Sequence, residues 1–370
     1  MSQLFSPLAL RNLQIANRLV VSPMCQYSAR DGLANDWHLV HLGSLALSGA
    51  ALLIIEATAV EPQGRITPGC LGLWSDAHVA ALEPILATIR RYSKTAVAIQ
   101  LAHAGRKGSS AVPWEGGQQI SPAQGGWIAS APSALPQIDG ELAPVALDRD
   151  GMVRIRDAFV AATRRADRLG IDGIELHAAH GYLIHEFLSP LANQRTDEYG
   201  GSLNNRMRFP LEVFDAIRGA FPAHKPVGVK VSATDWVAGG WDLEQTVSFA
   251  QELKKRGADW LSASSGGASP KQQIRSGPGY QVPFAETIRR ESGLAVMALG
   301  LITEPLQAET ILTSGQGDMV ALARAFLYDP RWGWHAAAEL GATVTAPPQY
   351  WRAPPYRHKD IFGKITQGGR

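Results

Sequence analysis

Short apolar runs alternate with longer amphipathic segments along most of the chain. Apolar runs rich in Val, Ile, Leu and Ala are typical of buried strands, and apolar residues three or four apart are typical of helices. The predicted strands cover residues 17–23, 51–57, 95–102, 171–177, 226–232, 258–264, 294–300 and 318–324. The segments between them predict helices over residues 38–50, 76–92, 150–170, 204–221, 243–257, 282–292 and 305–315.

This alternation predicts an α/β fold, a (β/α)8 TIM barrel, because strands separated by helices in this number suit that architecture. A doubly wound parallel sheet is the structural alternative. It is disfavoured because the segment VVSPMCQYS after the first strand contains no glycine, whereas a dinucleotide-binding fold places a GxGxxG motif there. We expect residues 1–370 to form one domain.

One connection is far longer than the others. Residues 109–146, after the third predicted strand, are rich in Gly, Pro, Ser and Gln and show no helical period. Loops of that length in a compact domain are usually functional or disordered. We expect this excursion to cross the active face of the barrel.

Composition and charge exclude several classes of function. Hydrophobic residues make up 45% of the chain and the formal net charge is +2, with no basic run interleaved with aromatics, so we expect no nucleic-acid partner. The apolar runs are too short to span a bilayer, and the N-terminus lacks the pattern of a signal peptide. We therefore expect a cytoplasmic protein without a membrane partner. Cys25 and Cys70 form neither a CxxC motif nor a disulfide framework.

In a barrel of this kind the chemistry lies on the loops that follow the strands. The predicted strand ends carry few carboxylates, many neutral donors and two cations. They present Pro23, Met24, Cys25, Tyr27, Glu56, Ala57, Thr58, Gln100, His103, His177, His180, Tyr182, Lys230, Ser232, Asp235, Gly300, Ala323 and Arg324.

The segment HAAHGY after the fourth strand concentrates three of these groups: His177, His180 and Tyr182. A metal site would need about three protein ligands, and no third one is evident, so no metal is expected. The plain structural alternative is a pair of hydrogen-bonded histidines at a strand edge. Neutral imidazole and phenol groups can instead donate hydrogen bonds to a carbonyl oxygen and deliver one proton, which is the interpretation we favour.

Two cations and an amide at the strand ends indicate a bound ligand. Lys230 lies within a predicted barrel strand, where the cost of desolvation disfavours a lysine unless its ammonium meets an anion or an acceptor. The structural alternative to a ligand is a salt bridge to Glu56 or Asp235. Arg324 with Gly300 matches the usual phosphate position of such barrels. Gln100 ends an apolar strand and suits a ligand contact. A planar phosphorylated cofactor fits this set.

Several motifs resemble the Old Yellow Enzyme family of flavin-dependent ene-reductases, and most closely its bacterial subclass with a cysteine near the flavin. They are SPMCQYSA, QLAHAGRK, HAAHGYLIHEFLSPLANQRTDEYGGSLNNRMRF, ARAFLYDPRW and PPQYWR, in family order from about residue 4 to about residue 352. The resemblance implies noncovalent FMN at the C-terminal face of the barrel. Its FMN contacts would be Ser22, Pro23, Met24, Cys25, Ala57, Gln100, Lys230, Gly300, Ala323 and Arg324.

The resemblance also implies a reaction and an assembly. NADPH or NADH would reduce the flavin, and an activated alkene, an α,β-unsaturated carbonyl or nitro compound, would then be reduced at its C=C bond. His177 and His180 would hold the substrate oxygen, Tyr182 would supply the proton, and Tyr27 would contact the substrate. Residues 345–370 would form a tail whose Arg352 enters a partner's substrate site in a homodimer or higher homo-oligomer.

This chain departs from the family pattern at two positions, and two alternatives remain. The family usually has arginine in place of Lys230 and often glycine in place of Ala323, which bears on the tuning of the flavin and the fit of its phosphate. Dienoyl-CoA reductases share the barrel but need an iron–sulfur cluster, and two cysteines cannot supply its ligands. A flavin-binding storage protein would bind FMN without turning over NADPH with an enone.

Overall fold

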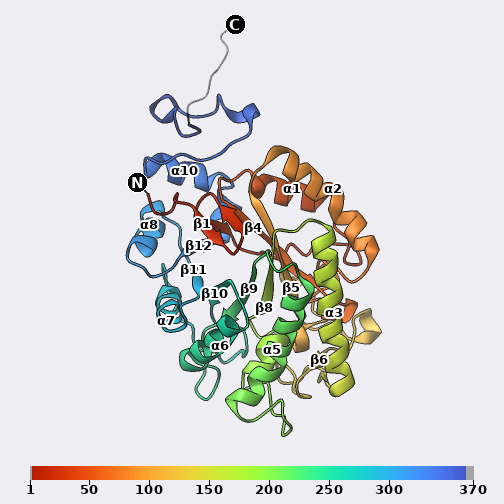
Figure 1. Ribbon diagram of the computed structural model, residues 1–370. Coiled ribbons are helices and arrows are strands. Elements are labelled where there is room, and N and C mark those ends of the chain that lie inside the picture. The colour runs from red at the N-terminus through yellow and green to blue at the C-terminus, as the bar shows by residue number, and fades with distance from the viewer. Residues whose placement is uncertain (1, 364–370) are drawn as a thin grey trace.

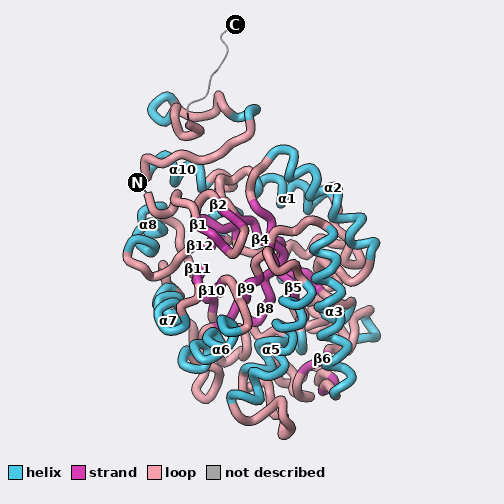
Figure 2. Tube along the Cα trace, viewed as in Figure 1, coloured by secondary structure: helices cyan, strands magenta, loops and turns pink. Residues whose placement is uncertain are grey.

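A closed parallel barrel forms the centre of the molecule, surrounded by helices (Figures 1 and 2). The computed structural model describes residues 2–363. Within these residues the barrel order is β10-β11-β12-β3-β4-β5-β8-β9, with parallel pairing throughout. The barrel strands are β3 (Leu19–Val21), β4 (Leu52–Ala59), β5 (Ala96–Ala102), β8 (Gly173–Ala178), β9 (Val227–Ser232), β10 (Trp260–Ser264), β11 (Ala295–Ala298) and β12 (Met319–Leu322). The predicted (β/α)8 barrel is confirmed.

Helices follow the strands and cover the outside of the barrel. They are α1 (Asp36–Ala46), α2 (Asp76–Tyr92), α3 (Arg149–Arg168), α4 (Leu183–Leu188), α5 (Leu203–Ala220), α6 (Leu243–Lys255), α7 (Val282–Ser292), α8 (Pro305–Thr313), α9 (Arg324–Tyr328) and α10 (Trp332–Glu339). The first helix ends at Ala46 rather than at residue 50. Gly49 has a φ of +91°, which is incompatible with a right-handed helix, and a Cβ there would lie 2.7 Å from Val344.

The barrel interior changes from apolar to polar along its axis. Strand side chains alternate between the interior and the helices. Near the strand starts Val20, Trp260 and Met297 pack in one buried cluster with Leu10 and Ile15. The last two belong to the N-terminal hairpin β1 (Leu8–Leu10) and β2 (Leu13–Ile15), which closes that end of the barrel. The polar interior residues therefore lie toward the opposite end, where the strands finish.

The long excursion after β5 is ordered and packs onto the barrel. It includes the short paired strands β6 (Ser130–Ala131) and β7 (Val145–Ala146). The Arg195 guanidinium donates to the carbonyls of Pro132 (3.0 Å) and Leu147 (2.6 Å), which holds the segment beside the loop that follows β8. Its place at the C-terminal ends of the strands agrees with the prediction.

The segment after α10 folds against its own chain, and Figure 1 shows it at the top, apart from the centre of the barrel. Trp334 makes edge contacts with Tyr350 (ring centroids 5.6 Å apart) and Phe362 (4.9 Å). Met1 and the last part of the predicted 345–370 tail, residues 364–370, lie outside the described residues. Among the helices described, none has the length and apolar character needed to cross a membrane.

Candidate active site

A cavity of about 320 Å³ opens at the C-terminal ends of the strands, on the side of β9 to β12. Seven residues singled out from the sequence line it: Ser22, Pro23, His180, Lys230, Gly300, Ala323 and Arg324. Gly300 has a φ of +111°, and a Cβ there would lie 2.9 Å from Oε1 of Gln281. Only glycine can bring the backbone this close to the cavity wall without strain.

The other predicted residues lie outside the lining of this cavity. Ala57 and Tyr182 line a small neighbouring cavity. Cys25 is a free thiol, and desolvation raises its pKa well above the usual value. Met24 packs at the edge of the hydrophobic core. Arg352 is exposed on the C-terminal segment and lines neither cavity.

Lys230 is a buried cation that faces the cavity. It is 6% exposed and makes no hydrogen bond or ion pair with another residue in the described range. Desolvation lowers the pKa of its ammonium, and the charge of Glu175 partly opposes that effect. The salt bridge to Asp235 or Glu56, raised from the sequence, is wrong, because Asp235 pairs with His185 (3.0 Å) and Glu56 lies beside His38 (3.5 Å).

Glu175 organises the barrel interior below the cavity. Its carboxylate accepts hydrogen bonds from Gln100 Nε2 (2.7 Å), Ser262 Oγ (2.5 Å) and Trp260 Nε1 (3.2 Å). Three donors satisfy a fully buried carboxylate that would otherwise be costly to desolvate. Gln100 is thereby fixed in orientation in the buried interior of the barrel.

His177, His180 and Tyr182 form one aromatic cluster. The His177 ring lies 5.2 Å from that of His180 and 5.0 Å from that of Tyr182, both in edge-to-face geometry. Burial lowers the pKa of each imidazole well below its usual value, and the charge of Lys230 adds to the effect. Burial also raises the pKa of the Tyr182 phenol well above 10. The cluster therefore holds two neutral imidazoles and a protonated phenol near neutral pH.

Two side chains from outside the cluster hold the turn that carries it. Lys107 Nζ donates to the His180 carbonyl (2.9 Å) and lies 4.9 Å from the Tyr182 ring centroid. His185 Nδ1 accepts from the Gly181 amide (2.9 Å), while its Nε2 faces Asp235. Desolvation lowers the pKa of Lys107 to about 8. The turn is thus preorganised by groups that themselves lie outside the cluster.

Several of these supporting residues were missed from the sequence. No candidate was taken from the sixth barrel strand, yet Ser262 and Ser264 both point into the barrel there. Their alternation with apolar residues in WLSAS is the signal that could have identified them. Lys107 lies in a motif noted for its resemblance, but nothing in its local pattern indicates which turn it contacts.

Tyr27 lies at the excursion side of the site. Its ring packs edge-on against Trp114 of the excursion, with centroids 5.8 Å apart. Burial raises the pKa of its phenol, and the neighbouring Cys25 adds to the effect. Tyr27 also has a φ of +52°, a left-handed conformation that is uncommon for a bulky residue. The loop after β3 thus turns this ring toward the excursion.

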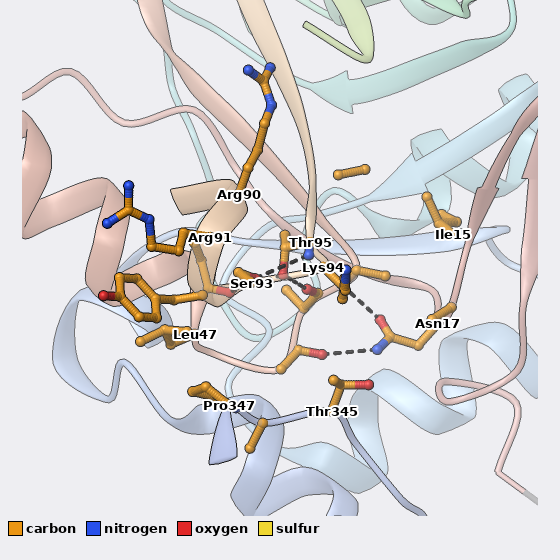
Figure 3. A pocket seen from close by; sticks show the side chains of 18 of the residues that line it. Ile15, Asn17, Leu47, Arg90, Arg91, Ser93, Lys94, Thr95, Thr345 and Pro347 are labelled. Carbon is orange, nitrogen blue, oxygen red and sulfur yellow. Dashed lines mark hydrogen bonds between the residues drawn. The ribbon is translucent and has the colours of Figure 1, made fainter. Parts of the chain in front are cut away.

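A second cavity, of about 280 Å³, lies at the opposite end of the barrel (Figure 3). Several of its polar lining residues make hydrogen bonds within the fold. The Asn17 amide donates to the Gly49 carbonyl (2.9 Å), and the hydroxyls of Ser93 and Thr95 donate to that of Ala46 (2.6 and 3.0 Å). No catalytic cluster converges there. Across residues 2–363 no group of three or more His, Cys, Asp or Glu residues could hold a metal ion.

Comparison with known proteins finds flavin oxidoreductases by sequence and by structure. The family model for NADH:flavin oxidoreductase / NADH oxidase matches residues 3–342. The NADPH dehydrogenase of Geobacillus sp. (strain WCH70) is 45% identical over 353 residues, which cover 95% of this chain and 98% of that enzyme. The NADPH dehydrogenase of Bacillus licheniformis is 43% identical over 354 residues, with the same coverage of both chains. Among solved structures, morphinone reductase is 28% identical with a TM-score of 0.74, covering 97% of this chain and 96% of that chain.

Proposed function

The chain belongs to the NADH:flavin oxidoreductase / NADH oxidase family, and on that premise we propose that it reduces the C=C bond of small α,β-unsaturated carbonyl or nitro compounds. Its class is NAD(P)H-dependent flavin oxidoreductase, with FMN as the cofactor. A flavin store without turnover, the alternative raised from the sequence, does not fit this class. The observation that carries the alkene proposal is the His177–His180–Tyr182 cluster beside a cavity that exposes an unpaired lysine.

The charges around the cavity fit FMN. Lys230 is buried and Arg324 is exposed. Both side chains line the cavity, and neither makes a hydrogen bond or an ion pair with another described residue. A phosphate and a flavin ring that gains negative charge would complement these two cations. We assign FMN to Ser22, Pro23, Met24, Cys25, Ala57, Gln100, Lys230, Gly300, Ala323 and Arg324. When bound, FMN supplies the two-electron chemistry, taking hydride from NAD(P)H and giving it to the alkene.

We assign His177 and His180 to the substrate oxygen. Reduction of an enone or nitroalkene places negative charge on this oxygen, and donors aimed at developing charge are most effective where water is excluded. His177 is 3% exposed and its Nδ1 accepts the Ala179 amide (3.2 Å), so in the neutral ring the proton lies on Nε2. That proton makes no hydrogen bond to a described residue and is available to the substrate.

We assign the proton for the α-carbon to Tyr182. Its pKa is raised by burial, so the phenol stays protonated near neutral pH, and its hydroxyl makes no hydrogen bond with another described residue. The nearby Lys107 ammonium, 4.9 Å from the ring centroid, would stabilise the negative charge left when the proton is given up. Tyr27 would contact the substrate from the excursion side.

We further propose a homodimer or higher homo-oligomer in which Arg352 completes the partner's substrate site. Residues Thr345–Pro348, close to Arg352, line the cavity at the strand-start end of their own barrel. Arg352 is exposed on this segment, which supports a role toward a second copy rather than toward its own cavity.

The visible spectrum of the purified protein tests the function directly. The protein should be yellow and release one FMN per chain on denaturation. Anaerobic NADPH should bleach the flavin absorbance, and 2-cyclohexen-1-one should then restore it. Bleaching without recovery by any enone or nitroalkene would contradict the alkene proposal while leaving the enzyme class intact.

A further inference from the structure

The two histidines of the cluster are held by different ring nitrogens. His177 uses Nδ1 to accept the Ala179 amide, whereas His180 uses Nε2, which lies 2.7 Å from Ser264 Oγ at the end of β10. Nδ1 of His180 makes no hydrogen bond with any described residue, and His180 lines the cavity. A neutral imidazole carries one donor and one acceptor, so the partner of one nitrogen decides what the other can offer.

The direction of the Ser264–His180 hydrogen bond follows from a third side chain. Nε2 of Gln281, which can only donate, lies 3.4 Å from Ser264 Oγ and 2.7 Å from Ser265 Oγ. The Ser264 oxygen accepts from Gln281, and among the described residues Nε2 of His180 is the one acceptor within reach of the single Ser264 hydroxyl proton, so Ser264 donates to His180. With Nε2 acting as acceptor, the ring proton of His180 resides on Nδ1.

The rest of the His180 environment fixes its backbone in place. Its backbone amide donates to Ser232 Oγ on β9 (2.9 Å), and its carbonyl accepts from Lys107. His180 has a φ of +61°, a conformation that non-glycine residues adopt rarely and that the surrounding contacts must maintain. The backbone of His180 is therefore anchored, and its ring is held through Nε2 while Nδ1 stays free.

We propose that Ser264 is a positioning residue that holds His180 in its Nδ1–H tautomer, so that both histidines present N–H donors to the substrate oxygen. This inference rests on the proposed role of the pair. In the opposite tautomer Nδ1 of His180 would direct a lone pair at an oxygen that gains negative charge, and the site would keep one donor instead of two. The lowered pKa of His180 supports the argument, because a protonated ring would donate from both nitrogens whatever Ser264 does.

Nitrogen NMR of protein labelled with ¹⁵N-histidine tests the tautomer without substrate. The FMN-loaded parent should show His180 protonated on Nδ1 and His177 on Nε2, with the His180 signals identified by their loss in His180→Gln. In Ser264→Ala the His180 signals should shift toward the Nε2–H form while those of His177 stay unchanged. Ser264→Thr keeps the hydroxyl and should restore the parental pattern.

The kinetic consequence provides the second readout. Ser264→Ala should lower the rate at which an enone reoxidises the reduced enzyme by about tenfold or more, while reduction by NADPH is preserved and Ser264→Thr recovers the rate. An unchanged tautomer in Ser264→Ala would overturn the inference. A His180 ring protonated on Nε2 in the parent would also overturn it, and that measurement does not depend on the stability of the alanine variant. If the tautomers are as predicted but no alkene is reduced, the proposed function fails instead.

Discussion

Replacing His177 by alanine should slow alkene reduction about 10²-fold while FMN binding and flavin reduction by NADPH stay close to parental. Loss of one preorganised donor to a developing oxyanion costs about 2.7–4 kcal/mol. We expect the lower end of that range because His180, whose ring is 5.2 Å away, remains to share the charge. Replacing both histidines should cost less than the product of the single effects, since the pair acts on one oxygen.

The alanine variant also removes a structural hydrogen bond, and this effect needs its own control. Without the imidazole, the buried Ala179 amide loses the acceptor that lies 3.2 Å away, which costs about 1–3 kcal/mol of folding stability. Asparagine at this position can accept a backbone amide two residues on, as in an Asx-turn. His177→Asn should therefore regain most of the thermal stability, and a slow alkene rate in this stable variant would show that the loss arises from the imidazole and not from the turn.

Anaerobic stopped-flow spectroscopy measures the two half-reactions separately. Because burial and Lys230 depress both histidine pKa values well below 6.5, the alkene half-reaction should show no loss of rate from these groups as pH rises from about 6 to 8. A parental alkene rate in His177→Ala, or an equal fall in both half-reactions, would refute the assignment of the donor.

Three further predictions follow from the site. Tyr182→Phe should slow reoxidation by the alkene but not reduction by NADPH, and an equal loss in both, measured by the same stopped-flow assay, would indicate a structural role. Lys230→Met should lower the flavin potential by roughly 30–65 mV, because a charge-assisted hydrogen bond of about 1.5–3 kcal/mol to the reduced flavin is lost. Lys230→Arg keeps the charge and should have a potential near that of the parent. An unchanged potential in Lys230→Met, measured by potentiometric titration, would contradict this role. Light scattering should show that the parent is an oligomer, and Arg352→Ala should raise the KM for the alkene. A parent that is monomeric and fully active would rule out a shared site.

The hydrophobic pattern of the sequence determined the architecture. Strands of a parallel barrel are buried on both faces, so each appears as a nearly continuous apolar run, and such runs are recognisable without knowledge of their neighbours. The strand ends could be located in the same way. Because the C-terminal ends of all strands meet on one face, the sequence also indicated that His177, Lys230 and Arg324 would converge.

Only the tertiary structure decided the partners of these side chains. Gln100 meets Glu175 across 75 residues of chain, and His180 meets Ser264 across 84. Lys230 and Asp235 are close in sequence, yet the first faces the cavity and the second pairs with His185. Hydrophobic period fixes which face of a strand a residue occupies, but the register of neighbouring strands and the packing of loops fix which atoms meet. Hydrogen-bond direction, and with it the free nitrogen of each histidine, depends on those meetings and has no local sequence signal.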